Sequence, residues 1–117
     1  AVRMTGDGYV SAEVDEDAQG TNYVGFRSAK GRLNDGQWHH ITVTRKGGDL
    51  ALYIDGKFSN SGSARRPANI RNNRPFRIGR SLVDRSTRRF APDATFDDLA
   101  IYSQALSAKE INYLYGN

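Results

Sequence analysis

The sequence predicts an all-β protein whose antiparallel strands form a sandwich or a barrel, and three observations lead to this. Isoleucine and valine alternate with threonine from Trp38 to Arg45, which places the apolar side chains on one face of a strand. Asp55-Gly56 is the strongest short signal for a β-hairpin, because both central residues of a type I′ turn need a positive φ. About seven strands in one chain must pack as layers to bury their apolar faces.

The central element is predicted to lie between Leu33 and Gly56. Asn34-Asp35-Gly36 is a turn signal before its first strand, and Lys46-Gly47-Gly48-Asp49 reverses the chain. In the returning strand, Leu50–Ile54, the leucines and the isoleucine share one face. A further strand, Lys57–Ser61, is expected directly after the Asp-Gly turn.

The remaining strands are predicted from shorter alternating patterns: Tyr9–Val14, Thr21–Arg27, Phe76–Gly79 and Thr95–Tyr102. The segments 62–74 and 80–92 show no periodicity and are predicted to be loops.

A short helix is predicted at the end of the chain. Ser107 is a suitable N-cap, and Glu110 three residues later completes a capping box. Ile111, Leu114 and Tyr115 form an apolar stripe that would seat the helix on the edge of a sheet. A helix this short is not stable alone, so docking must hold it.

Length and composition favour one domain over residues 1–117, and they leave open that this is the C-terminal part of a longer domain. The sequence has no cysteine, which excludes a disulfide framework and thiol chemistry. It has no apolar run long enough to span a membrane.

Four motifs together carry a resemblance to a known family: LNDGQWHHITVTR, LALYIDGK, FRIGRS and FDDLAIYSQALSAKEI. They resemble successive strands of laminin G-like domains, whose fold is the concanavalin A-type jelly roll, and the likeness extends from about Tyr9 to the C-terminus. The resemblance implies a two-sheet jelly-roll sandwich. It also implies an extracellular module that binds glycans or cell-surface proteins, often with a calcium ion. Members of the family usually have several more strands before the position where this chain begins, so a protein partner, an oligomer or a cleaved N-terminal piece is expected to complete the sheets.

Arginine dominates one stretch of the sequence. The net charge is +4, and the first twenty residues are mainly acidic, so the pattern predicts one acidic end and one basic surface. The expected anion-binding residues are Arg65, Arg66, Arg71, Arg74, Arg77, Arg80, Arg85, Arg88 and Arg89. Guanidinium groups bind carboxylate, sulfate or phosphate through paired hydrogen bonds. The alternative interpretation, a solvated face in an arginine-favouring proteome, is equally weighted.

Nucleic acid is disfavoured as the anionic partner. Proteins that bind single strands interleave aromatic and basic residues, and only Phe76 and Phe90 lie within this stretch. An acidic glycan, an anionic surface or an acidic protein fits better.

The sequence predicts no enzyme. His39 and His40 are neighbours on a predicted strand and would point to opposite faces, so they cannot share a metal ion. Glu13-Val14-Asp15 begins the E-x-D-x-x-E pattern of jelly-roll glycoside hydrolases, but the third acid is replaced by Ala18. The two-carboxylate mechanism then lacks its acid/base partner.

No cofactor is assigned with certainty, and calcium is the one to consider. The resemblance implies Asp97 as a calcium ligand; the alternative is that Asp97 or Asp98 binds backbone groups of the neighbouring loop. The loop Asp15–Asp17 could hold a hard cation, although a solvated acidic loop is the favoured interpretation. The aromatic residues outside the arginine stretch could stack on sugars, but a core position is favoured for each: Tyr9, Tyr23, Trp38, Tyr53 and Tyr102.

These observations favour a non-catalytic recognition module that binds carbohydrate, expected to be an acidic glycan, through arginine-rich loops. Two alternatives remain open. One is a structural domain that makes protein contacts in a phage or cell-surface appendage, and the other is an accessory domain of a polysaccharide-degrading enzyme. All three place the protein outside the cell or on a cell or virion surface.

Overall fold

The computed structural model describes residues 1–17, 19–73, 75–78 and 94–117. They fall into two compact units, a main unit formed by Ala1–Ile70 with Tyr102–Asn117, and a second unit, Arg71–Ile101. The main unit holds all the strands and the helix that the described residues form. No helix in the described part of the chain is long and apolar enough to cross a membrane.

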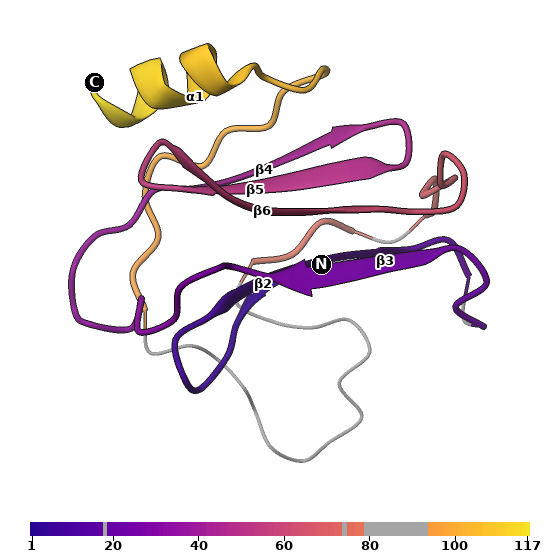
Figure 1. The fold of residues 1–117 in the computed structure, drawn as a ribbon, viewed down its shortest axis with the longest axis horizontal. Helices are drawn as coiled ribbons and strands as arrows, with labels where there is room; N and C mark the ends of the chain where they lie inside the picture. Colours follow the sequence, from indigo (N-terminus) through magenta and orange to yellow (C-terminus); the bar gives the residue numbers. More distant parts are fainter. Residues whose placement is uncertain (18, 74, 79–93) are drawn as a thin grey trace. The chain divides into compact units, whose positions relative to one another are not determined.

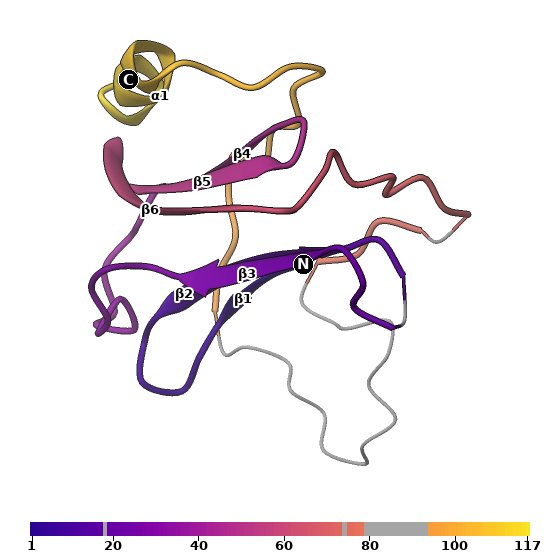
Figure 2. The same cartoon turned by 45° about the vertical axis from the view of Figure 1, so that its right-hand side comes forward.

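The main unit contains two antiparallel three-stranded sheets, which confirms the predicted all-β class and its two-sheet architecture. Sheet A has the order β1 (Val2–Met4), β2 (Val10–Asp15), β3 (Tyr23–Arg27). Sheet B has the order β4 (Ile41–Lys46), β5 (Asp49–Ile54), β6 (Lys57–Ser63). Figures 1 and 2 show sheet B lying between sheet A and the helix α1 (Ala108–Tyr115).

The core lies where the two sheets face each other. Val10 and Ala12 on β2 are 2% and 1% exposed, and Leu50 and Leu52 on β5 are 3% and 0% exposed. The period of two along each strand places these side chains on the inner faces, as the sequence predicted. Burying one such leucine contributes about 1.5–3 kcal/mol relative to leaving it exposed.

Local turn chemistry sets the register of sheet B. Asp55 and Gly56 have φ values of 52° and 74°, as a type I′ turn requires, and Ile54 pairs with Lys57 across it. Gly47 has a φ of 63° in the turn that pairs Lys46 with Asp49. Both predicted turns are confirmed.

The helix also begins and ends as predicted. The Ser107 side chain accepts a hydrogen bond from the Glu110 backbone, and the Glu110 carboxylate accepts one from the Ser107 backbone. Ile111 is completely buried, whereas Leu114 and Tyr115 are exposed, so the docking stripe is narrower than predicted.

The edges β3 and β6 of the two sheets lie side by side. A Cβ at Gly62 would lie 2.8 Å from side-chain carbons of Phe26 and Val24, so the absence of a side chain permits this approach. Asn60 donates a hydrogen bond from Nδ2 to the carbonyl of Arg27 at 2.9 Å.

Two predicted strands are wrong and one strand was missed. Residues 76–78 and 95–102 form no strand, and Gly79 lies outside the described residues. A strand needs a neighbour to pair with its N–H and C=O groups, and no described strand pairs with either segment. Conversely, β1 has little alternation but pairs with β2.

We predict that Gly62→Ala lowers the free energy of unfolding by about 1–3 kcal/mol, because the new methyl group overpacks the contact between β3 and β6. Gly6→Ala is the matched control, since nothing lies within 4 Å of its added Cβ. Urea denaturation of both variants measures the difference. Equal stability of the two variants would contradict the close approach.

Candidate functional site

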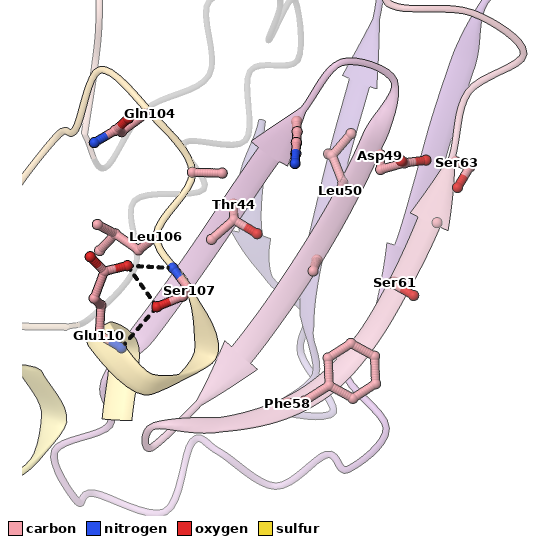
Figure 3. Close-up of a pocket in the computed structure, with 14 residues that line it drawn as sticks. Thr44, Asp49, Leu50, Phe58, Ser61, Ser63, Gln104, Leu106, Ser107 and Glu110 are labelled. Atoms are coloured by element: carbon pink, nitrogen blue, oxygen red, sulfur yellow. Dashed lines mark hydrogen bonds between the residues drawn. The ribbon is translucent and has the colours of Figure 1, made fainter. Parts of the chain in front are cut away.

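An open groove of about 780 Å³ lies on the outer face of sheet B, a volume in the range of small-ligand sites (Figure 3). Thr44, Ala51 and Ser61 are in register across β4, β5 and β6 and line its floor. Strand alternation turns these three side chains away from the core. The chain that leads into α1, residues 104–107, forms one wall.

The two ends of this outer groove differ in chemistry. Phe58 lies at one end, is 60% exposed, and packs edge-on against Tyr53 with ring centroids 5.8 Å apart. Lys46, Asp49 and Ser63 lie at the end near the β4–β5 turn. The outer groove therefore combines an aromatic ring, a row of hydroxyl groups, a charged end at the turn and the Glu110 carboxylate beside Ser107.

A second hollow of about 520 Å³ adjoins the charged end. The turn residues Gly47 and Gly48 line it, together with the chain after β6, which we call the crossover segment (residues 64–70). Arg65 is exposed on this segment.

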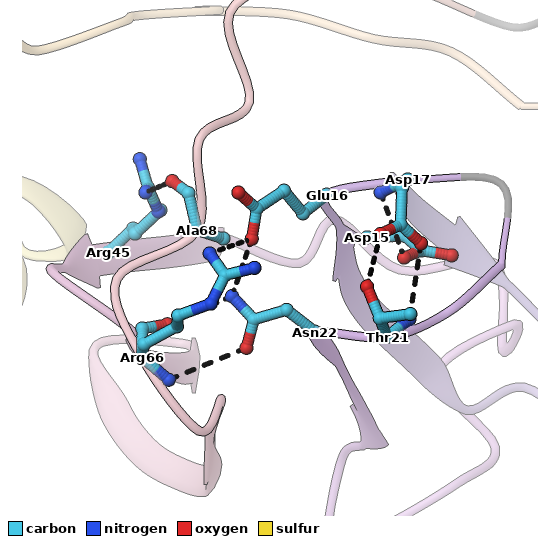
Figure 4. A network of polar contacts seen from close by, with 8 residues as sticks. All are labelled: Asp15, Glu16, Asp17, Thr21, Asn22, Arg45, Arg66 and Ala68. Atoms are coloured by element: carbon cyan, nitrogen blue, oxygen red, sulfur yellow. Dashed lines mark hydrogen bonds and ion pairs between the residues drawn. The ribbon is translucent and has the colours of Figure 1, made fainter.

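The crossover segment is held to the β2–β3 connection by a buried amide (Figure 4). Asn22 is 2% exposed, and its Nδ2 donates to Glu16 Oε2 at 2.8 Å and to the Arg66 carbonyl at 3.1 Å. The Arg66 guanidinium donates from Nη1 to the same Glu16 oxygen at 2.5 Å. Hydrogen bonds from Arg66, and then from Asn22, lower the pKa of Glu16, so the carboxylate stays ionised.

A second anchor joins the crossover segment to sheet B. Arg45 on β4 donates from Nη2 to the carbonyl of Ala68, which is 5% exposed. The Nε of Arg45 is buried and has no hydrogen-bond partner in the described residues. The segment is therefore fixed from both sheets.

The structure locates four of the nine predicted arginines. Arg74, Arg80, Arg85, Arg88 and Arg89 lie outside the described residues. Arg65 and Arg66 are neighbours in the main unit, and Arg71 and Arg77 belong to the second unit. The expected convergence of all nine into one surface stays a prediction.

The predicted acidic end and basic surface stay a prediction, and the structure shows one contact between them. The ion pair between Glu16 and Arg66 brings the acidic loop into contact with the start of the arginine-rich stretch. Arg66 is therefore committed to the scaffold, whereas Arg65 makes no hydrogen bond or ion pair with the described residues.

The acidic loop uses its carboxylates locally. Asp17 accepts hydrogen bonds from the backbone N–H groups of Gln19 and Thr21 at 3.0 and 3.1 Å and from the Thr21 hydroxyl, and the hydroxyl contact is the main cause of its lowered pKa. Asp15 accepts from the N–H of Asp17 at 3.4 Å. These bonds agree with a structured, solvated loop rather than a cation site.

The Asp97 carboxylate also binds the neighbouring backbone. Its Oδ1 accepts a hydrogen bond from the N–H of Asp98 at 2.8 Å, which fits the alternative that the sequence allowed. Within the ranges that the structure describes, no group of three or more ligating side chains is placed to hold a metal ion. A calcium role for Asp97 stays a prediction.

His39 and His40 lie just before β4, and both bind the carboxylate of Asp55. His39 Nδ1 lies 2.9 Å from Asp55 Oδ2, and its Nε2 lies 3.1 Å from Asp35 Oδ1. Only a protonated ring can donate to both carboxylates. The hydrogen bond to Asp55 raises the pKa of His39 most, Asp35 adds to it, and partial burial opposes it. The backbone N–H of His40 donates to the other oxygen of Asp55 at 2.9 Å.

The described residues do not form the three-carboxylate arrangement of the hydrolase pattern, which begins at Glu13. Glu13 forms an ion pair with Arg3, and Ala18 lies outside the described residues. The absence of catalysis stays a prediction.

The core positions predicted for three aromatic residues are wrong. Trp38 is 69% exposed, Tyr23 is 51% exposed, and Tyr102 is also exposed. β4 begins only at Ile41, so the inward and outward alternation does not extend back to Trp38. Tyr23 lies on the outer face of sheet A, opposite buried Val24.

Two residues of the outer groove were missed by sequence reasoning. Lys46 was interpreted only as part of a turn, and Phe58 only as part of a strand. The signal for Phe58 was an aromatic residue that alternation in β6 places on the outer face, opposite Tyr53.

We predict that Arg66→Gln destabilises the protein, whereas Arg65→Gln changes its free energy of unfolding by less than about 0.5 kcal/mol. Arg66 is bound by Glu16, and Arg65 is exposed one position earlier, so the two variants are matched. Asn22→Ala should cost about 1–3 kcal/mol, because it leaves buried partners unsatisfied. Urea denaturation tests all three, and equal effects of the two arginine variants would contradict the anchoring role.

We predict that stability falls as the pH rises through the raised pKa of His39. A group whose pKa is raised on folding contributes its full stability below the ordinary value of 6.5 and loses it as the pH rises through the folded value. Urea denaturation of wild type and His39→Gln between about pH 6 and pH 8.5 measures this. The variant should lack the fall, and an unchanged pH slope would refute the role of His39.

Comparison with known proteins gives a family and a fold. Residues 1–112 match the sequence model of Laminin_G_3, described as the concanavalin A-like lectin/glucanases superfamily. The crystal structure of an S-layer domain-containing protein from Clostridium thermocellum is similar, with a TM-score of 0.62 and 24% identity over 97% of this chain. That match covers 54% of the other chain, so this chain spans about half of its length. No curated protein matches significantly. The chain therefore belongs to the Laminin_G_3 family of the concanavalin A-like lectin/glucanases superfamily.

Proposed function

We propose that this chain is a non-catalytic recognition domain, outside the cell or on its surface, that binds an acidic glycan through the arginine-rich stretch between Arg65 and Arg89. One observation carries the proposal. The side chains of Arg65 and Arg77 are exposed, and neither forms an ion pair with a described carboxylate. Membership of a lectin superfamily and a net charge of +4 support the same ligand class.

The chemistry of recognition follows from the guanidinium group. Its planar fork donates two parallel hydrogen bonds to a carboxylate or a sulfate. Exposed pairs of this kind are screened by salt, so affinity should fall steeply as the ionic strength rises. Arg66 is not counted among the groups available to a ligand, because its guanidinium already binds Glu16.

A structural role in a surface assembly is the second candidate. One protein of similar structure is an S-layer domain-containing protein, which supports a surface location. The terminal strands β1, β3, β4 and β6 each have one strand partner among the described residues, and unpaired edges recruit other chains. Light scattering distinguishes this candidate, because it requires oligomers, whereas glycan recognition is compatible with a monomer.

We predict that the double variant Arg65→Gln/Arg77→Gln binds acidic glycans about ten-fold or more weakly than wild type, the loss expected when two charge-assisted contacts are removed. The matched control is Lys30→Gln/Lys109→Gln, which removes the same net charge at exposed positions elsewhere. A glycan array at low and at high ionic strength, followed by titration of the best ligand, measures the effect.

Two results would count against the proposal. One is the absence of any acidic ligand at low ionic strength. The other is an equal loss of affinity in the arginine variant and the lysine control, which would indicate attraction by net charge alone.

A further inference from the structure

We infer that the outer groove and the second hollow form one continuous site for an acidic oligosaccharide, with the sugar rings on sheet B and an anionic substituent between Lys46 and Arg65. This inference rests on the proposed function and gives it a location. The arginine pattern alone did not point to the face of sheet B.

The first step is the continuity of the two hollows. Lys46 and Asp49 line both of them and face each other at the β4–β5 turn. The outer groove extends from this turn along sheet B to Phe58, as Figure 3 shows. An elongated ligand can therefore pass from the face of the sheet to the crossover segment without leaving the protein surface.

The second step is the charge at the turn. Lys46 and Arg65 are exposed cations, and neither forms an ion pair within the described residues. Arg66 also lines the second hollow, but Glu16 neutralises it. Two carboxylates also line the site: Asp49, which faces Lys46 across the turn, and Glu110, which accepts hydrogen bonds from Ser107 in the capping box. Asp49 can accept hydrogen bonds from sugar hydroxyls, and Lys46 and Arg65 are the cations that an anionic group would meet.

The third step is the chemistry of the groove floor. Thr44, Ser61 and Ser63 present hydroxyl groups that make no hydrogen bond with the described residues, and each can donate and accept. Phe58 leaves more than half of its surface exposed at the far end. A row of hydroxyls ending at an exposed ring suits a sugar, which has both hydroxyl groups and apolar C–H faces.

The same features favour a glycan over other polyanions. A nucleic-acid strand needs repeated aromatic platforms for its bases, and this groove offers one exposed ring. An extended acidic peptide is usually bound along an open strand edge, whereas this site is the face of a sheet.

The experiment places a negative charge on the groove floor and, as a control, on the other sheet. Ser61→Glu should weaken binding of a heparin hexasaccharide or of oligogalacturonate, whichever wild type binds better, about ten-fold or more. Ser11→Glu makes the same change on the outer face of sheet A, where Arg3 and Arg27 flank it, and should stay within about two-fold of wild type. Titration calorimetry with the full chain measures each affinity.

If Ser61→Glu does not fold, which circular dichroism would reveal, a second pair of variants tests the site. Lys46→Gln and Phe58→Ser change exposed side chains at opposite ends of the site, and each should weaken binding at least about three-fold. If wild type binds neither oligosaccharide, the proposed function and this site are both overturned. If wild type binds but the folded groove variants match Ser11→Glu, only the groove is overturned, and the arginine-rich stretch remains the binding element.

Discussion

The buried side chain of Asn22 is the contact on which the arrangement of the main unit most depends. It holds the crossover segment against the β2–β3 connection through hydrogen bonds to Glu16 and to the backbone of Arg66. A buried amide must find partners, because an unsatisfied polar group in the interior is costly. The segment that leaves sheet B is therefore fixed to sheet A, and Arg65 is presented at the edge of the second hollow.

Adjacent arginines have different roles in this arrangement. Arg66 neutralises Glu16 and stabilises the scaffold, whereas Arg65 extends from the same segment toward solvent. Residue type cannot separate these roles, because both side chains carry the same guanidinium group. Only the position of Glu16, fifty residues earlier in the chain, distinguishes them. A count of charges along the sequence therefore overestimates the cations that a ligand can reach.

The sequence predicted best what neighbouring residues determine. The Asp55-Gly56 turn and the capping box at Ser107 depend on a few adjacent residues, and both formed as expected. The strand predicted at 95–102 failed because pairing depends on a distant partner. The outer groove could not be predicted for the same reason, since it combines Thr44, Ser61 and residues 104–107, which only the fold brings together.

The contact between β3 and β6 brings the ends of the two sheets together on one side of the sandwich. Gly62 lies against Phe26 and Val24, and the Asn60 side chain binds a carbonyl of β3. Each of β1, β3, β4 and β6 ends its sheet in the described structure, and such an edge is a template for an added strand. A strand from another chain that adds to β3 would therefore lie beside the edge of the other sheet, so one partner chain could bridge the two layers on this side.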